Sequence, residues 1–127
     1  MFDNMSKVTQ GSAGLGIAIG HFCSKGIVVS LPLVDNQDYD LIIDEDGKLK
    51  KVQVKTTGTK SPSGNYEVQI KSVRSNKTIN KIKSFDPNAV DYLFVLCGDG
   101  SKYLFPSNEI TVKGALTLTP ERVKYKV

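Results

Sequence analysis

The sequence predicts an α/β or α+β fold in which a mixed central β-sheet is flanked by helices. Three observations predict it: an amphipathic segment near the start, a strong hairpin signal in the middle, and a nearly continuous apolar run over residues 91–97. The chain has 127 residues, of which 39% are hydrophobic and 24% are charged. These values are typical of a globular protein with a single core, so we expect residues 1–127 to form one domain.

Residues 8–25 are predicted to form the opening helix. Their apolar residues recur at helical spacing and make one stripe: Leu15, Ala18, Ile19 and Phe22. The same segment contains four glycines, and each costs about 1 kcal/mol relative to alanine inside a helix. We therefore expect a neighbouring element to approach the helix closely. The glycines do not form a dinucleotide-binding fingerprint, because their spacing differs and no strand precedes them.

The remaining elements are predicted to be short strands separated by turns. Their ranges are 27–31, 39–44, 49–55, 66–70, 91–97, 102–105 and 115–118. The run 91–97 is apolar at almost every position, which predicts a central strand that is buried on both faces. Residues 75–85 are predicted to form a weak helix, because Ile79, Ile82 and Phe85 fall on one side of it.

The hairpin formed by 39–44 and 49–55 is predicted to bring three polar side chains together. If Asp46 and Gly47 form a two-residue turn, the register pairs Asp40 with Gln53. Directly opposite residues point to the same face of a sheet. Lys55 lies two residues beyond Gln53 and therefore shares that face. The sequence thus predicts a carboxylate, an amide and an ammonium group on one patch.

A three-residue turn is the competing register, and the hydrophobic pattern argues against it. It would place Asp40 opposite Val52 and mix apolar with polar residues on both faces. In the favoured register Leu41 faces Val52, and Tyr39 faces Val54, on the side of the core. We therefore keep the two-residue turn.

This arrangement resembles the signature of the PD-(D/E)xK nucleases. Asp40, twelve intervening residues and then Gln53-Val54-Lys55 match an acid followed by a short (D/E)-x-K strand. The wider run 26–57 is similar to small endonucleases associated with group I introns, and the likeness extends over about residues 10–110. The resemblance implies a restriction-endonuclease-like core and a metal-dependent DNA endonuclease, site-specific and of the homing type.

The resemblance also implies roles for the hairpin residues. Asp40, the side-chain oxygen of Gln53 and the carbonyl of Val54 would hold Mg²⁺, with Mn²⁺ as a substitute. Lys55 would lie beside the attacking water, either orienting it or stabilising charge at phosphorus. Asp40, Gln53 and Lys55 are thus the candidate catalytic residues. Because Gln53 replaces the usual acid, we expect weaker metal binding, with one ion favoured over two.

The family often has a glutamate in its first helix, near the position of Leu15. The segment 8–25 contains no acid. We hypothesise that Asp35 or Asp38 approaches the site and supplies the missing negative charge.

The segment 71–84 is strongly basic and contains no acid. Its basic residues are Lys71, Arg74, Lys77, Lys81 and Lys83. Serines and asparagines lie between them, and such mixtures suit contacts to phosphates and base edges. We predict that this segment binds DNA and that Thr56 contacts the backbone near the cleaved bond; a solubilising face is the alternative. The net charge of +4 agrees with a polyanionic partner.

The expected partner is double-stranded or branched DNA, bound by a homodimer or homotetramer, because so small a domain contacts only a short duplex. A nuclease that resolves Holliday junctions, or a binding module that has lost cleavage, is the alternative. No run is long enough to span a membrane and no secretion signal is evident, so we expect a cytoplasmic protein. Cys23 and Cys97 are expected to be reduced and buried, and His21 to lie near the core.

Overall fold

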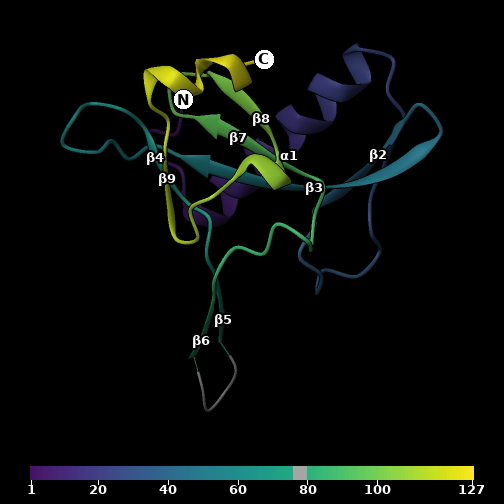
Figure 1. The fold of residues 1–127 in the computed structure, drawn as a ribbon, viewed down its shortest axis with the longest axis horizontal. Coiled ribbons are helices and arrows are strands. Elements are labelled where there is room, and N and C mark those ends of the chain that lie inside the picture. Colours follow the sequence, from purple (N-terminus) through teal and green to yellow (C-terminus); the bar gives the residue numbers. More distant parts are fainter. Residues whose placement is uncertain (76–79) are drawn as a thin grey trace.

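A five-stranded mixed sheet forms the centre of the protein in a computed structural model that describes residues 1–75 and 80–127 (Figure 1). Its strand order is β1-β2-β3-β7-β8. The bounds are β1 (Val29–Ser30), β2 (Leu41–Glu45), β3 (Lys48–Thr57), β7 (Tyr92–Cys97) and β8 (Lys102–Pro106). Strands β3 and β7 run parallel, and the other neighbours are antiparallel. The predicted fold class is confirmed.

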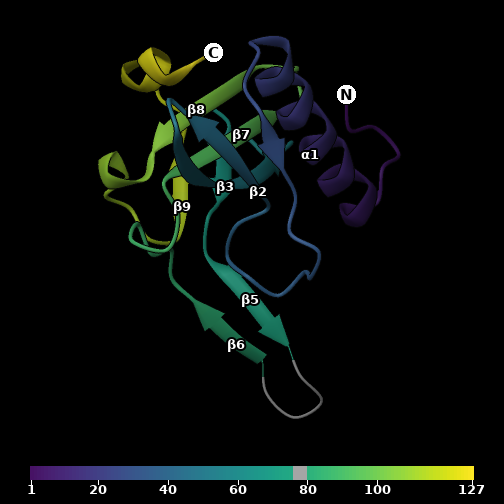
Figure 2. The ribbon, with the colours of Figure 1, turned by 90° about the vertical axis from the view of Figure 1, so that its right-hand side faces the viewer.

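Smaller elements surround this sheet. The helix α1 (Lys7–Ser24) precedes it, and β4 (Glu67–Gln69) pairs with β9 (Ala115–Thr117). Strands β5 (Ser72–Ser75) and β6 (Asn80–Lys83) pair with each other and extend away from the body (Figures 1 and 2). We call these two strands the β5–β6 arm. Two 3₁₀ helices, η1 (Ser107–Glu109) and η2 (Pro120–Tyr125), lie near the end of the chain.

The helix predicted over 75–85 is wrong, because Ser75 and the strand Asn80–Lys83 belong to the arm. Val73 pairs with Ile82 in an antiparallel register. Short apolar runs do not distinguish a helix from a strand by spacing alone. The segment is also rich in serine, threonine and asparagine, which are weak helix formers. Ile79, on which the helical pattern depends, lies outside the described residues.

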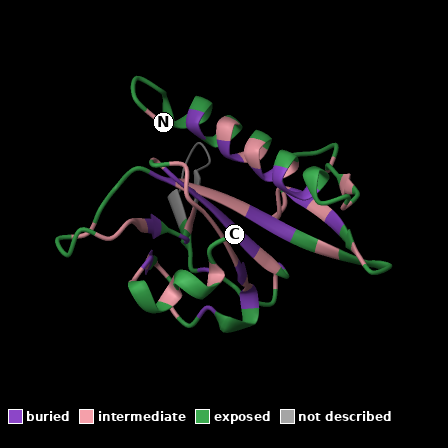
Figure 3. Cartoon of the chain, turned by 90° about the horizontal axis from the view of Figure 1, so that it is seen from above, coloured by how far each residue is buried: buried purple, intermediate pink, exposed green. Residues whose placement is uncertain are grey.

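Both faces of the central sheet are covered. Helix α1 covers one face, where Ala18 and Phe22 pack against Leu41 and Phe94. The opposite face carries a second core cluster, which includes residues of β4, β9 and the segment 85–90. Figure 3 shows the buried side of α1 turned toward the sheet. Neighbouring β7 residues alternate between the clusters, which confirms that β7 is buried on both faces.

One glycine lets α1 lie against β3. A Cβ atom at Gly14 would lie 2.4 Å from Cγ2 of Thr56, so only glycine fits without a shift. Next to it, Nε2 of Gln10 donates a hydrogen bond of 2.9 Å to Oγ1 of Thr56. Ser6 caps the helix by accepting a hydrogen bond from the backbone N–H of Thr9. The close approach expected from the glycine-rich pattern is confirmed at Gly14.

His21 and the two cysteines are placed by α1 and β7. His21 is buried, with its ring 5.2 Å from that of Phe22, and burial is the main cause of its lowered pKa. Cys97 is buried, but Cys23 is exposed. The prediction that Cys23 is buried is wrong, because its helical position faces away from the sheet. No helix in residues 1–75 and 80–127 has both the length and the hydropathy needed to cross a membrane.

Candidate active site at the start of strand β2

The turn between β2 and β3 fixes the register that the site depends on. Asp46 and Gly47 both adopt left-handed backbone conformations, with φ values of 53° and 84°. These values match a two-residue hairpin turn. The ladder runs from Glu45 opposite Lys48 to Leu41 opposite Val52. The predicted register is therefore confirmed from Glu45 to Leu41. The ladder does not include the predicted pair of Asp40 with Gln53, because β2 begins at Leu41 and the Asp40 N–H donates to the Val52 carbonyl instead.

Asp40 lies one residue before β2, at the end of the ladder between β2 and β3. Its backbone N–H donates to the carbonyl of Val52 at 2.9 Å. Its carboxylate accepts a hydrogen bond of 2.7 Å from the backbone N–H of Val54. The Asp40 carboxylate therefore lies at the edge of β3 beside Val54, at a position that β2 does not reach.

The Val54 carbonyl shares this edge. The N–H and C=O of one strand residue point to the same side, so alternate residues bond to opposite neighbours. The carbonyls of Lys51 and Thr57 accept bonds from Asp91 and Gly98, on the side of β7. Val54 alternates with these residues, so its N–H and carbonyl point away from β7, and its N–H donates to the Asp40 carboxylate. Its carbonyl thus points to the same side as the Asp40 carboxylate.

Gln53 and Lys55 lie on the face of β3 opposite α1. Gln53 is only 8% exposed and lines a small recess beside the second core cluster. The hydrogen bonds among the described residues include none to its amide, although every fully buried side-chain oxygen and nitrogen there has a partner. The Gln53 amide therefore reaches solvent and is available to a ligand.

Charge and burial oppose each other at Asp40 and Lys55. Burial is the largest effect on Asp40 and raises its pKa, and the charge of Asp35 raises the pKa further. The hydrogen bond from the Val54 N–H and the charge of Lys55 lower this pKa. Burial lowers the pKa of Lys55, and Asp40 opposes that shift. The two groups thus lie within electrostatic reach of each other. Each would be stabilised in its charged form by an additional charged ligand of opposite sign.

We expect Asp40→Asn to be more stable than the wild type at neutral pH, by about 1 kcal/mol. A carboxyl with a raised pKa binds its proton more readily in the folded state, so the free energy of unfolding falls as pH rises between 3.8 and the raised value. Above this window the ionised Asp40 is a net destabilising charge. Urea unfolding at neutral pH and below pH 3.8 measures the difference, which should vanish at the lower pH. Asp3→Asn, an exposed carboxylate, is the control; equal gains in both variants would contradict the argument.

The other predicted residues are placed in different ways. Thr56 lies on the face of α1, bound to Gln10, and not on the face of Lys55. Its contact with the DNA backbone stays a prediction, and the site geometry does not support it. Tyr39 packs against the second core cluster and not beside Val54, because β2 begins only at Leu41 and the alternation does not extend before it. The prediction from strand alternation that Tyr39 faces Val54 is therefore wrong.

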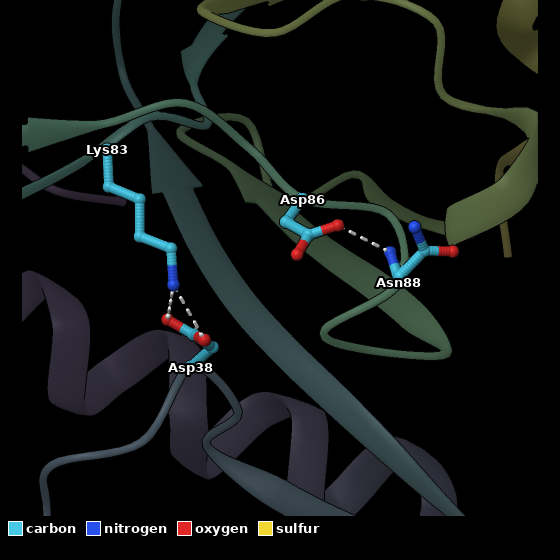
Figure 4. A network of polar contacts seen from close by, with 4 residues as sticks. All are labelled: Asp38, Lys83, Asp86 and Asn88. Carbon is cyan, nitrogen blue, oxygen red and sulfur yellow. Dashed lines mark hydrogen bonds and ion pairs between the residues drawn. The ribbon is translucent and has the colours of Figure 1, made fainter.

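The basic residues of 71–84 follow the arm. Lys71 is exposed just before β5, and the register pairs Arg74 with Lys81 across the two strands. Lys77 lies outside the described residues. Lys83, the last residue of β6, forms an ion pair of 3.2 Å with Asp38, which precedes the site (Figure 4). The sequence singles out both residues but not their contact, because the contact depends on the arm being a hairpin.

The oxygen donors at the site are of the chemical type that a hard divalent cation prefers. No three histidine, cysteine, aspartate or glutamate side chains converge to hold a metal anywhere in the described ranges. The donors that the site does offer are the Asp40 carboxylate, the Gln53 amide oxygen and the Val54 carbonyl. All three are oxygens, which Mg²⁺ prefers, and Mg²⁺ commonly keeps several waters beside one or two carboxylates.

A mixed sheet with an acid just before its second strand and a lysine on its third strand is the arrangement typical of PD-(D/E)XK nucleases. The sequence matches the model of the PD-(D/E)XK endonuclease family over residues 5–125, and the chain belongs to this family. Among solved structures it is similar to a bacterial homing endonuclease, I-Ssp6803I, at 27% identity and a TM-score of 0.82. That match covers 95% of this chain and 88% of the other. No curated protein matches the chain significantly.

Proposed function

We propose that this protein is a Mg²⁺-dependent, site-specific DNA endonuclease of the homing type, with Mn²⁺ as a substitute. One observation carries the proposal: the Asp40 carboxylate is fixed on the Val54 backbone within electrostatic reach of Lys55. The family match and the similarity to a homing endonuclease support it. Members of this nuclease family generally use divalent metal ions.

The residues of the site have separate roles in the proposed reaction. Asp40, Gln53 and Val54 supply the oxygen ligands, and a bound cation would polarise the scissile phosphate and acidify a water. Lys55 neutralises negative charge as it develops at phosphorus. Lys55 is half-buried, which reduces the screening of this interaction by water. The Val54 N–H holds the Asp40 carboxylate in place, so its orientation does not depend on the ligand.

The β5–β6 arm is the proposed DNA-binding element. It follows β3 and β4 in the chain and pairs Arg74 with Lys81 across its two strands. It also extends away from the body (Figure 2), which suits contact with a duplex bound at the site. On this proposal Lys71, Arg74 and Lys81 contact phosphates, which position the DNA. The same role is predicted from the sequence for Lys77, outside the described residues. The short reach of one arm favours a symmetric homodimer or homotetramer for a long target. Light scattering of the purified protein measures that state.

Nicking of a supercoiled plasmid library tests the proposed function. We expect nicking with Mg²⁺ or Mn²⁺ and none with excess chelator. DNA binding without nicking in any metal would indicate a binding module, which the absence of acid from α1 favours. Preference for a four-way junction over linear duplex would indicate a junction-resolving nuclease.

Gln53→Glu is expected to bind Mn²⁺ about tenfold more tightly, because a carboxylate adds charge to the ligand set. The same variant should unfold at a lower temperature than the wild type without metal, since the residue is nearly buried. Calorimetric titration and thermal unfolding with and without Mn²⁺ measure both effects. Gln69→Glu, on an exposed position of β4, is the control. An unchanged Mn²⁺ affinity in Gln53→Glu would remove Gln53 from the ligand set.

A further inference from the structure

The loop between β1 and β2 carries three apolar side chains that face solvent. Leu31, Leu33 and Val34 are 54%, 103% and 61% exposed, although aliphatic residues of this size are usually buried. We call these three residues the apolar tip. No other four consecutive positions of the described chain hold three exposed large apolar side chains. Single exposed apolar residues are ordinary, but a cluster marks a surface that meets a partner.

The apolar tip lies on a loop whose two ends are fixed. Strand β1 pairs with β2 immediately before the loop, and the N–H of Asp40, at its end, donates to the carbonyl of Val52. Within the loop, Nε2 of Gln37 donates a hydrogen bond to the carbonyl of Val34. Pro32 also restricts one backbone angle between the apolar residues. Binding through the tip therefore costs less conformational entropy than binding through a free loop.

The loop and the β5–β6 arm lie on the same side of the central sheet. Two perpendicular views show both of them extending from the sheet in the same direction (Figures 1 and 2). An ion pair of 3.2 Å between Asp38 of the loop and Lys83 of β6 joins them (Figure 4). Asp40, the proposed metal ligand, ends the same loop. A duplex that is held by the arm and reaches Asp40 therefore comes within reach of the apolar tip.

The chemistry of the loop suits a groove of DNA and not its phosphates. No lysine or arginine lies between Lys25 and Lys48, and Asp35 follows the tip directly, so a phosphate finds no cation here. Proteins that bind the minor groove frequently insert apolar side chains such as leucine between base steps. A stable contact between two protein copies buries about 800 Å² on each, which three aliphatic side chains on one loop do not supply.

We propose that the apolar tip is a wedge that enters the minor groove beside the cleaved bond, with Leu33 inserted between two base pairs. The inference rests on the proposed function and names a DNA contact of the same site. Insertion unstacks one base step and kinks the duplex there. Steps that unstack easily, such as TA and CA, are then favoured at this position without a hydrogen bond to any base.

Leu33→Trp reports the insertion directly, because the chain contains no other tryptophan. In the Lys55→Ala background, which we expect not to cleave, this tryptophan should lose most of its fluorescence when a mixed-sequence duplex with TA steps is bound. An indole stacked between bases is quenched, whereas one that only contacts protein is not. Val8→Trp in the same background is the matched control, since Val8 is 81% exposed on α1, and its fluorescence should not change.

The outcomes separate this inference from the proposed function. Duplex binding without a loss of fluorescence from Leu33→Trp, or with equal losses from Leu33→Trp and Val8→Trp, would overturn the wedge and leave the nuclease proposal standing. If the wild type neither binds the duplex nor nicks plasmid in any metal, the proposed function fails and the wedge fails with it.

Leu33→Ser tests whether the contact is apolar. It should weaken duplex binding about tenfold, because a buried leucine is lost. The slope of log affinity against log salt should stay unchanged, because no phosphate contact is removed. Lys71→Gln should instead reduce that slope by about one. Leu49→Ser, 71% exposed in the β2–β3 hairpin, is the apolar control and should bind like the wild type.

Three results with Leu33→Ser would contradict the proposal. They are an unchanged affinity for the duplex, a reduced salt slope, and a lower molar mass by light scattering than the wild type. The last result would show that the apolar tip joins two copies of the chain. Circular dichroism confirms that each variant is folded, which is expected because Leu33 is fully exposed.

Discussion

Under the proposed function, Asp40→Asn is expected to lower the rate of DNA cleavage by about 10³-fold, because the proposed metal site would lose the carboxylate that the Val54 N–H holds in place. Asparagine keeps an oxygen that can accept the hydrogen bond now donated by the Val54 N–H at 2.7 Å. The hairpin should therefore keep its structure, and the loss should appear in cleavage and not in folding. Single-turnover cleavage with saturating protein separates this effect from DNA affinity.

Lys55→Ala is the companion to this experiment, with an expected loss of about 10²–10³-fold. Its control is Lys51→Ala, on the same strand and face but with its ammonium over the ring of Tyr39 at 5.4 Å. We expect Lys51→Ala to cleave within about threefold of the wild type, since a remote surface charge has a small effect. Cleavage by Lys55→Ala at the level of Lys51→Ala would contradict the role of Lys55.

Gly14→Ala is expected to lower the free energy of unfolding by about 1–3 kcal/mol, the usual cost of overpacking. The new Cβ would lie 2.4 Å from Cγ2 of Thr56. Threonine is β-branched and has few alternative rotamers, so the strain passes to the backbone of β3. Urea unfolding followed by circular dichroism measures the change.

Two controls test this explanation. Gly16→Ala, whose Cβ meets nothing within 4 Å, should gain up to about 1 kcal/mol from helix propensity alone. Thr56→Ser removes Cγ2 but keeps the hydroxyl that accepts from Gln10, so it should restore the stability of Gly14→Ala. Equal effects at Gly14 and Gly16 would show that the contact with Thr56 is not the cause.

The parts of the fold that sequence predicts well are those set by local chemistry. The Asp46-Gly47 turn specifies its own left-handed conformations, and these fix the register of β2 against β3. The apolar run that forms β7 similarly predicts burial on both faces. The turn and the alternation of polar residues are enough to place Gln53 and Lys55 on one face of β3. Asp40 lies before β2, and its bond to the Val54 N–H is not indicated by the alternation.

The parts that sequence predicts poorly depend on where strands end and on distant partners. Alternation places Tyr39 beside Val54, but β2 begins at Leu41, and no residue near that position signals the boundary. The contact between Thr56 and Gln10 spans 46 residues of sequence, so no local pattern indicates it. The apolar residues of the arm are too few for their spacing to distinguish a helix from a strand. The ion pair between Asp38 and Lys83 depends on the position of that arm and is hidden for the same reason.

The β5–β6 arm lies within the long connection that joins β3 to its parallel neighbour β7. Both ends of this connection are anchored in the sheet, and a change in the length of such a segment costs little free energy. Mutations, insertions and exchanges can therefore accumulate in the arm without disturbing the hairpin of Asp40 and Lys55. Under the proposed function, the architecture lets target preference diversify during evolution while the hydrolytic chemistry is inherited unchanged.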